Sequence, residues 1–187
     1  MKLLKTSLVL ILSILCFSCS DDDNETPPTV INEEEVITTV ELSITDTESG
    51  KTEIISWVAD KNDSSNPEIK LAANKSYETA VRFLNASNPE DVEDITKEVV
   101  EEKDEHFIFF TASETLKGFT VTSNLDKDTI DSNTVGINVE TNWTTVDAGT
   151  GKLTVFLIHE PTTKEGTTRN AFGGATDVEV TFNVVIE

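Results

Sequence analysis

The chain has 187 residues, of which 14 are lysine or arginine and 35 are aspartate or glutamate, so its formal net charge is −21. A polyanion of this kind repels nucleic acid and anionic lipid headgroups, which speaks against both as direct partners. Both cysteines, Cys16 and Cys19, lie near the N-terminus. The rest of the chain therefore has no disulfide, thiolate nucleophile or cysteine-ligated metal site.

Residues 1–18 have the pattern of a lipoprotein signal peptide. Lys2 and Lys5 form a positive start, an uncharged apolar stretch covers residues 7–15, and small Ser18 directly precedes Cys19. The apolar stretch is shorter than the roughly 20 residues that span a bilayer. It resembles the lipobox of bacterial lipoproteins, which implies that Cys19 is diacylated and becomes the mature N-terminus. The alternative is an ordinary secretory signal with an unmodified cysteine.

The residues after Cys19 predict a disordered tether and a localisation signal. Ser20 is followed by Asp21, Asp22 and Asp23, which resembles the acidic signal that sends some lipoproteins to the outer face of the outer membrane. Residues 19–35 are rich in acidic residues and too poor in apolar residues to form a core, so we expect them to be disordered. We therefore expect a lipid-anchored protein of the outer membrane that faces either the cell surface or the periplasm.

Residues 36–187 predict a single β domain. Short segments in which every second residue is apolar follow one another, which is typical of strands with one buried face. The expected strands are 38–44, 54–58, 77–84, 106–110, 119–122, 135–140, 153–159 and 178–186. About eight short strands rich in threonine and valine predict an all-β fold, an antiparallel two-layer, immunoglobulin-like β-sandwich.

One acidic segment departs from this alternation. Val92, Ile95, Val99 and Val100 are spaced as on one face of a helix, and Pro89 with two following acidic residues is typical of a helix start. We expect a short acidic helix over residues 91–102 that covers one end of the sandwich. An edge strand is the alternative, because Thr96, Val99 and Val100 are β-branched.

Two loops are dense in side-chain oxygens, the donors that calcium prefers. The first spans residues 60–67. The second, residues 124–131, has the stronger alternation, with Asn124, Asp126, Asp128 and Asp131 as candidate ligands. Neither loop has the glycine and the bidentate glutamate of the helix-loop-helix calcium site, and aspartate and asparagine are also common in turns. A turn and a calcium site are both compatible with each loop.

The two histidines form a second candidate metal site. His106 follows Glu105, His159 precedes Glu160, and each histidine lies at the end of a predicted strand. If the fold brings them together, two imidazoles and carboxylates could bind zinc or copper. Because adjacent strand residues point to opposite faces, we expect only one member of each histidine–glutamate pair to face a common ligand.

Aromatic residues and catalytic motifs provide weaker evidence of function than the candidate metal sites. Trp57 and Trp143 are expected in the core, but Trp143 follows a predicted strand and is the candidate for an exposed ligand contact. The sequence has no Ser-His-Asp arrangement, zinc-peptidase spacing or phosphate loop. A pair of catalytic carboxylates of the glycosidase type cannot be identified, because none of the many acidic residues has a distinctive sequence context. We therefore expect a non-enzymatic protein, with a carboxylate-dependent hydrolase as the least favoured alternative.

Several short motifs occur together along the mature chain. They are Ser20–Asp23, Asn32–Val40, Glu93–Thr96, Asp104–His106, His159–Pro161 and Gly173–Phe182. As a set they resemble a family of small acidic bacterial lipoproteins usually labelled type 1 periplasmic binding fold superfamily proteins. The label implies a two-lobed α/β protein that binds a small ligand and has no catalytic residues. The alternating strands, without repeated βαβ units, predict a β-sandwich instead.

The sequence thus favours two functions. The first is a lipid-anchored protein that captures an unknown small solute or assists an outer-membrane transporter. The second is a structural module that binds calcium, zinc or copper. No other cofactor is indicated, and the membrane is contacted through the lipid on Cys19.

Overall fold

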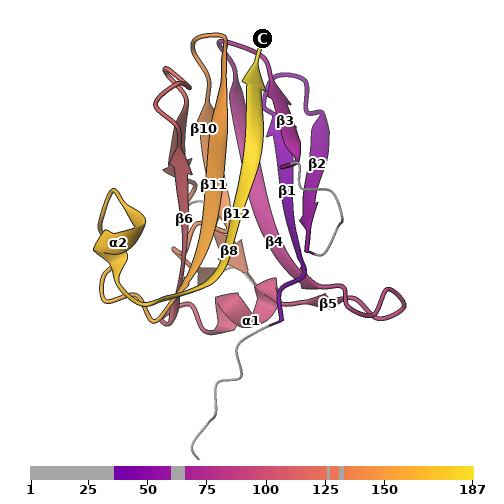
Figure 1. Ribbon diagram of the computed structural model, residues 1–187, viewed down its shortest axis with the longest axis vertical. Coiled ribbons are helices and arrows are strands. Elements are labelled where there is room, and N and C mark those ends of the chain that lie inside the picture. The colour runs from indigo at the N-terminus through magenta and orange to yellow at the C-terminus, as the bar shows by residue number, and fades with distance from the viewer. Residues whose placement is uncertain (1–35, 60–65, 126, 131–132) are drawn as a thin grey trace, which may run out of the picture. The chain divides into compact units, whose positions relative to one another are not determined.

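The computed structural model describes residues 36–59, 66–125, 127–130 and 133–187. In this part of the chain two β-sheets pack face to face, which confirms the predicted sandwich (Figure 1). The described residues all belong to one compact unit. No helix among them is both long and apolar enough to cross a membrane.

The first sheet is antiparallel and has the order β2-β1-β4-β10-β7, with β5 paired to β4. Its strands are β1 (Thr39–Asp46), β2 (Thr52–Val58), β4 (Ser76–Asn85), β5 (Glu93–Asp94), β7 (Thr120–Ser123) and β10 (Glu140–Thr144). Asp46 organises the tight turn between β1 and β2, because its carboxylate accepts hydrogen bonds from the backbone N–H groups of Glu48 and Ser49.

The second sheet has the order β3-β12-β11-β6 and is mixed, because β3 runs parallel to β12. Its strands are β3 (Glu68–Leu71), β6 (His106–Ala112), β11 (Gly149–His159) and β12 (Ala175–Ile186). A separate two-stranded hairpin consists of β8 (Thr129–Ile130) and β9 (Asn133–Thr134). The expectation of purely antiparallel sheets therefore does not hold at β3. This strand alternates as Glu-Ile-Lys-Leu, but alternation does not show in which direction a strand pairs.

The core lies between the sheets and follows the predicted alternation. Residues two apart on each central strand are buried, whereas the residues between them are mostly exposed or half-buried. The inward-facing set includes Val40, Leu42, Ile44, Tyr77, Val81, Phe83, Leu153, Val155, Leu157, Val180, Phe182, Val184 and Ile186. Burying each such side chain stabilises the fold by roughly 1.5–3 kcal/mol, which explains why this pattern could be read from the sequence.

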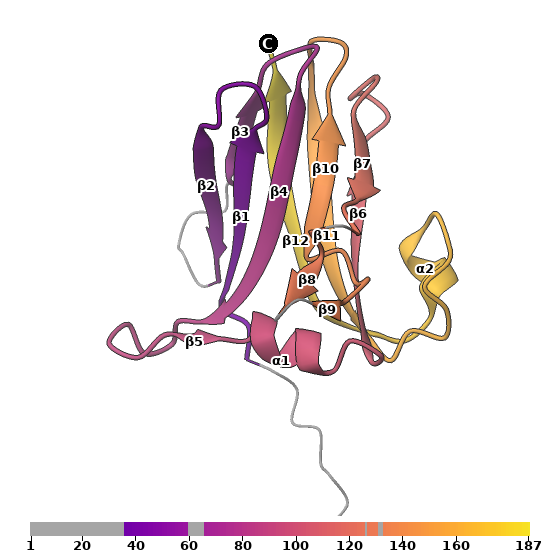
Figure 2. The same cartoon turned by 180° about the vertical axis from the view of Figure 1, so that it is seen from behind.

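The acidic helix is shorter than predicted. α1 covers Thr96–Glu101, whereas Glu93–Asp94 forms β5 and the residues before it form a turn. The hydroxyl of Thr96 accepts a hydrogen bond from the Phe83 N–H and donates one to the Phe83 carbonyl, which fixes the helix start to β4. These bonds begin the helix five residues later than Asp91. α1 lies across the end of the sandwich that is opposite the C-terminus (Figure 2).

The strand expected over residues 135–140 is also wrong. Ile137 is buried and its neighbours two residues away pack on the core, but the segment is irregular, and the strand β10 begins only at Glu140. Asn138 adopts a left-handed backbone conformation, with φ 70°. Gly136 also has positive φ, 68°. An alternating apolar pattern therefore predicts which side chains are buried, but these two residues with positive φ interrupt the strand.

A second, smaller apolar cluster covers the outer face of the β6–β11 sheet. Phe107, Phe156, Ile158 and Phe172 form it, with Phe109 packed against them. Phe172 belongs to α2 (Arg169–Phe172), a helix the sequence did not predict, in the connection between β11 and β12. Its ring centroid lies 5.1 Å from that of Phe107 and 4.7 Å from that of Phe109. This contact anchors the connection to the sheet.

Candidate functional site

The Asp128 loop, residues 124–138, contains the predicted calcium ligands. Asp128 is completely buried, and its carboxylate accepts hydrogen bonds from the backbone N–H groups of Asn138 (3.0 Å) and Glu140 (3.4 Å). The Asn124 side chain donates to the side-chain oxygen of Asn142, at 3.0 Å. These two residues therefore organise the loop itself, as short polar side chains do in turns. Asp126, Asp131 and residues 60–65 lie outside the described residues.

Glu140 extends this loop toward β4. Burial raises the pKa of Glu140, and the negative charge of Asp128 raises it further, whereas Lys127 lowers it. Two carboxylates that repel each other would favour a cation between them. The Asp128 carboxylate nevertheless has two backbone N–H groups as its hydrogen-bond donors, so no calcium ion is needed to satisfy it.

Trp143 does not form a surface platform. Its side chain is fully buried on β10, contacts Phe110 and Phe119 edge to face, and donates its indole N–H to the hydroxyl of Thr141. The candidate role of Trp143 in ligand contact is therefore wrong. The tryptophan lies within a strand rather than after one, and its position in the alternation turns it into the core.

The structure brings His106 and His159 together. His106 is the first residue of β6 and His159 is the last residue of β11, and the antiparallel pairing of these strands places the two directly opposite each other. Opposed residues have Cβ atoms about 5 Å apart. The two rings stack with their centroids 4.9 Å apart and an angle of 11° between their planes. Both side chains face the inner side of the sheet, as Ile108 and Leu157 do.

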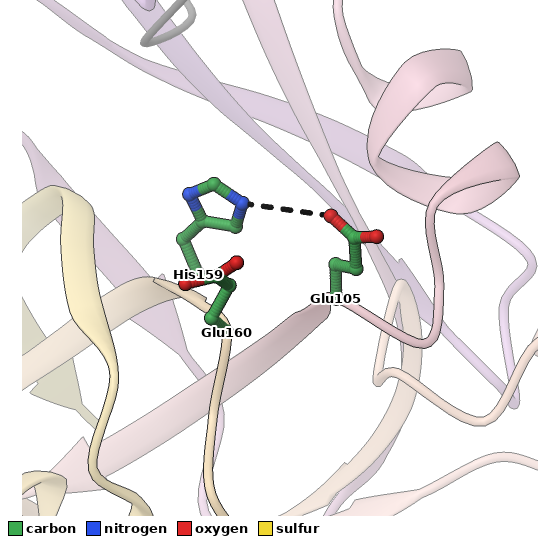
Figure 3. A group of neighbouring side chains, drawn as sticks. All are labelled: Glu105, His159 and Glu160. Carbon is green, nitrogen blue, oxygen red and sulfur yellow. Dashed lines mark ion pairs between the residues drawn. The ribbon is translucent and has the colours of Figure 1, made fainter. Parts of the chain in front are cut away.

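Two glutamates flank this pair, and the expectation that strand alternation would separate them from it is wrong. Glu105 precedes β6, and Glu160 follows β11 with a left-handed backbone, φ 48°, so neither obeys the alternation. Glu105 Oε2 lies 3.9 Å from His159 Nε2. One ligand atom each from Glu105, His159 and Glu160 lie within 4.8 Å of one another (Figure 3).

Asp177 completes the group, although the sequence did not indicate it. The β11–β12 register shifts between Leu157 and Ile158, which pair with Val178 and Thr176, so Asp177 is the extra residue of a β-bulge. Bulges redirect side chains. Here Asp177 Oδ2 lies 3.7 Å from His106 Nε2 and Oδ1 lies 3.9 Å from His159 Nδ1. We call Glu105, His106, His159, Glu160 and Asp177 the histidine cluster.

The end of α1 orients the buried histidine. His106 Nδ1 lies 3.3 Å from the carbonyl oxygen of Glu102, and a carbonyl only accepts, so Nδ1 carries the proton of this hydrogen bond. Burial lowers the pKa of His106, outweighing the Glu102 hydrogen bond and nearby Asp177, and this favours the neutral ring. A neutral imidazole with one nitrogen bound to a carbonyl presents a lone pair on the other, as metal-ligating histidines do.

Gly174 allows the chain to return past the cluster. It has φ 64°, and a Cβ at this position would lie 2.2 Å from the carbonyl oxygen of His159. Only glycine fits such a close approach with this backbone conformation. The guanidinium of Arg169 donates to the carbonyl oxygens of Gly173 and Gly174, which holds the turn before β12. Gly174 thus allows the backbone that leads into β12 to pass close to the end of β11, where Asp177 lies near His159.

The histidine cluster has the donors of a transition-metal site. Nitrogen and carboxylate ligands suit zinc and copper, whereas calcium requires six to eight oxygens. Two ligands bound at about 2.1 Å to one ion are about 3.4 Å apart in a tetrahedral arrangement and at most about 4.2 Å apart. The imidazole–carboxylate separations of 3.7–3.9 Å exceed a hydrogen bond and fit below this limit. The 4.8 Å that encloses Glu105, His159 and Glu160 is slightly larger, so the exposed glutamates would move inward by a few tenths of an ångström around an ion.

Comparisons with protein-family models, with curated proteins and with solved structures found no match to this chain. The residues predicted to direct lipidation and export, Cys19, Ser20, Asp21, Asp22 and Asp23, lie outside the described residues. The interpretation of the histidine cluster as a candidate metal site therefore depends on its geometry alone.

Proposed function

We propose that this protein binds a divalent transition-metal ion, zinc or copper, at the histidine cluster. The observation that supports the proposal is the convergence of Glu105, His159 and Glu160, whose ligand atoms lie within 4.8 Å of one another. The residues lie at one end of the antiparallel β6–β11 pair, so the pairing of the two strands brings them together before any ion binds. A preformed set loses less conformational entropy when the ion arrives.

The surrounding charges favour a cation at this position. Glu102, Glu105, Glu160 and Asp177 contribute four carboxylates around two imidazoles. The Oε2 atom of Glu102 is buried and has no hydrogen-bond partner among the described residues. Concentrated negative charge in a partly dry environment costs free energy, and a bound cation offsets that cost.

The exposure of the ligands favours an exchangeable ion. The side chain of Glu105 is 57% exposed, and Glu160 is exposed as well. Three protein ligands leave a fourth position open on zinc, where water or another molecule can bind. An ion held in this way can enter and leave from solvent, as a binding or delivery protein requires.

The sequence supports a location of this domain at the cell envelope. The signal peptide, the lipobox with Cys19 and the acidic residues that follow favour a lipid-anchored protein of the outer membrane. The motif resemblance to small acidic lipoproteins of the periplasmic-binding type points in the same direction. A tethered metal-binding domain fits the role of an accessory protein that supplies an ion to a neighbouring membrane transporter.

Metal binding is tested by isothermal titration of the purified full-length protein with zinc and with copper. We expect micromolar or tighter binding to the wild type and at least tenfold weaker binding to Glu105→Gln with Glu160→Gln, because both carboxylate ligands lose their charge. Glu114→Gln, an exposed glutamate elsewhere on the surface, is the matched control and should bind like the wild type. Equal affinity of all three proteins would overturn the proposal.

The anchor requires a separate test. Palmitate labelling of growing cells should mark the wild type and leave Cys19→Ala unlabelled, and equal labelling of both would overturn the proposed lipid anchor. Protease treatment of intact cells then distinguishes the two orientations. Degradation of the domain would show that it faces the cell surface, and protection would place it in the periplasm.

A further inference from the structure

A pocket of the first sheet lies where β10 and α1 meet the same edge of β4 (Figure 2). β10 pairs with residues 76–80 of β4, whereas the hydroxyl of Thr96 in α1 bonds to the backbone of Phe83, farther along the strand. Between these contacts the Val81 N–H donates to the Val139 carbonyl, and a pocket of about 260 Å³ opens there. Sites for small molecules usually measure about 300–1,000 Å³, so this pocket suits a correspondingly small solute.

The walls of this pocket are mainly apolar. Ala80, Val135 and Val139 line it, and all three side chains are half-buried. Ala80 lies on the outer face of the sheet, because its neighbours Thr79 and Val81 point into the core. Apolar surface that is still in contact with water favours a hydrocarbon group that covers it.

Glu140 places a carboxylate at the pocket. It pairs with Ala80 across the β4–β10 ladder, so the two side chains lie on the same outer face. The side chain is half-buried, and neither carboxylate oxygen forms a hydrogen bond or an ion pair with another described residue. Burial and the charge of Asp128 raise its pKa. The negative charge at this position is therefore poorly compensated, and a cationic ligand would stabilise it.

The cations near the pocket do not neutralise Glu140. Arg82 forms ion pairs with Asp94 at 2.9 Å and with Glu41 at 3.4 Å. Lys127 lowers the pKa of Glu140, but its ammonium is ion-paired with Glu78.

Lys97 lines the pocket from α1 and is exposed. It follows Thr96, whose bond to Phe83 lies three residues along β4 from Ala80. Three strand residues span roughly 10 Å, so Lys97 belongs to the end of the pocket away from Glu140.

We propose that this pocket binds a small primary amine, with the ammonium group on Glu140 and an apolar body along Ala80, Val135 and Val139. An ammonium group supplies the missing positive charge and three N–H donors to the carboxylate. A bare metal ion fits less well, because calcium and similar ions require several oxygen ligands and these walls are mainly apolar. The site shares no residue with the histidine cluster, so the proposal is independent of metal binding.

The test compares three probes with the same hydrocarbon chain and different head groups: pentylamine, pentanol and pentanoate. Each is titrated into the full-length protein while amide nuclear magnetic resonance spectra are recorded. We expect pentylamine to shift the amide signals of Ala80 and Val139 in a saturable manner. Pentanol should bind roughly tenfold more weakly, because it lacks the charge-assisted hydrogen bond. Pentanoate should bind more weakly still, because its charge would lie beside Glu140.

Two variants separate the head group from the walls. Glu140→Gln should bind pentylamine roughly tenfold more weakly than the wild type and pentanol equally well. Ala80→Leu fills the pocket and keeps the carboxylate, so it should weaken the binding of both probes. Ala80→Val is the smaller substitution in case Ala80→Leu does not fold, and far-UV circular dichroism checks each variant. Glu114→Gln, exposed elsewhere on the surface, should bind all three probes like the wild type.

The outcomes distinguish the parts of the proposal. Equal affinity of the wild type and Glu140→Gln for pentylamine, or tighter binding of pentanoate than of pentylamine, would overturn the role of Glu140. Unchanged binding to Ala80→Leu and Ala80→Val would overturn the pocket. Tighter binding of the blocked tripeptide Gly-Lys-Gly than of pentylamine would overturn the solute in favour of a lysine side chain from another protein.

Discussion

The Asp128 loop and the histidine cluster are built from similar acidic residues but use them differently. In the loop, the buried carboxylate of Asp128 accepts hydrogen bonds from two backbone amides of its own segment. In the histidine cluster, Asp177 faces two imidazole nitrogens across 3.7 and 3.9 Å. A carboxylate paired with backbone amides stabilises the fold, whereas one that lies beside imidazole nitrogens has neighbours of the kind that bind transition-metal ions. The partners of an acidic residue, rather than its type, thus distinguish a structural role from a binding role.

The largest effect expected from this comparison is on stability, at Asp128. Asp128→Ala leaves the N–H groups of Asn138 and Glu140 without their acceptor in a buried position, which should lower the free energy of unfolding by about 2 to 4 kcal/mol. Chemical denaturation measures this change. Asp128→Asn, which keeps one acceptor oxygen, should lose less. A stability increase on adding calcium to the wild type, absent from Asp128→Ala, would contradict the structural role.

The second effect is the stabilisation of the folded protein by zinc. A zinc concentration 100 times the dissociation constant stabilises the folded protein by about 2.7 kcal/mol, which corresponds to a rise of about 5 to 11 °C in the midpoint of thermal unfolding. We expect this rise in the wild type and in Asp128→Asn, and its loss in His159→Gln. Calcium should leave the midpoint unchanged. A calcium-dependent rise that survives His159→Gln would reverse the roles assigned to the two regions.

The third effect is the pH dependence of Glu140, next to the Asp128 loop. Burial and the charge of Asp128 raise its pKa above the ordinary value of 4.5 in the folded protein. Above pH 4.5 the unfolded chain therefore loses this proton first, and the free energy of unfolding falls until the folded carboxyl has also ionised. Glu140→Gln lacks this fall, so it should gain stability relative to the wild type between about pH 4 and pH 7, by less than the Asp128→Ala loss. Denaturation curves at both pH values measure the gain, and parallel pH profiles would contradict it.

The smallest effect is expected at the surface of the same loop. Lys127 forms an ion pair with Glu78, and both side chains are substantially exposed. Such pairs contribute less than about 1 kcal/mol, so Lys127→Met should change the free energy of unfolding by less than this amount. The zinc-dependent midpoint shift should be unaffected, and Lys117→Met in an exposed turn provides the matched control. A loss comparable to that of Asp128→Ala would show that surface charge also supports the loop.

Much of the fold could be predicted from the sequence because local pattern decides it. The alternation in β1, β4 and β12 requires one buried face in any arrangement, so these strands and their inward-facing residues followed from spacing alone. The same rule failed over residues 135–140. There the positive φ of Gly136 and Asn138 and the hydrogen bond from Asn138 to Asp128 determine an irregular path, and none of these changes the apolar spacing.

For the candidate site, the sequence supplied the ligand types and the tertiary structure supplied their positions. Both histidines and their neighbouring glutamates could be named from the sequence, because each lies at a strand end and carries metal-binding chemistry. The packing of the whole sheet decides that β6 pairs with β11. It also decides the register, which places His106 opposite His159. The bulge that turns Asp177 toward both rings, and the left-handed Glu160 beside Gly174, depend on contacts between distant segments. Local residue preferences contain no information on such contacts, so only the folded chain brings the ligands together.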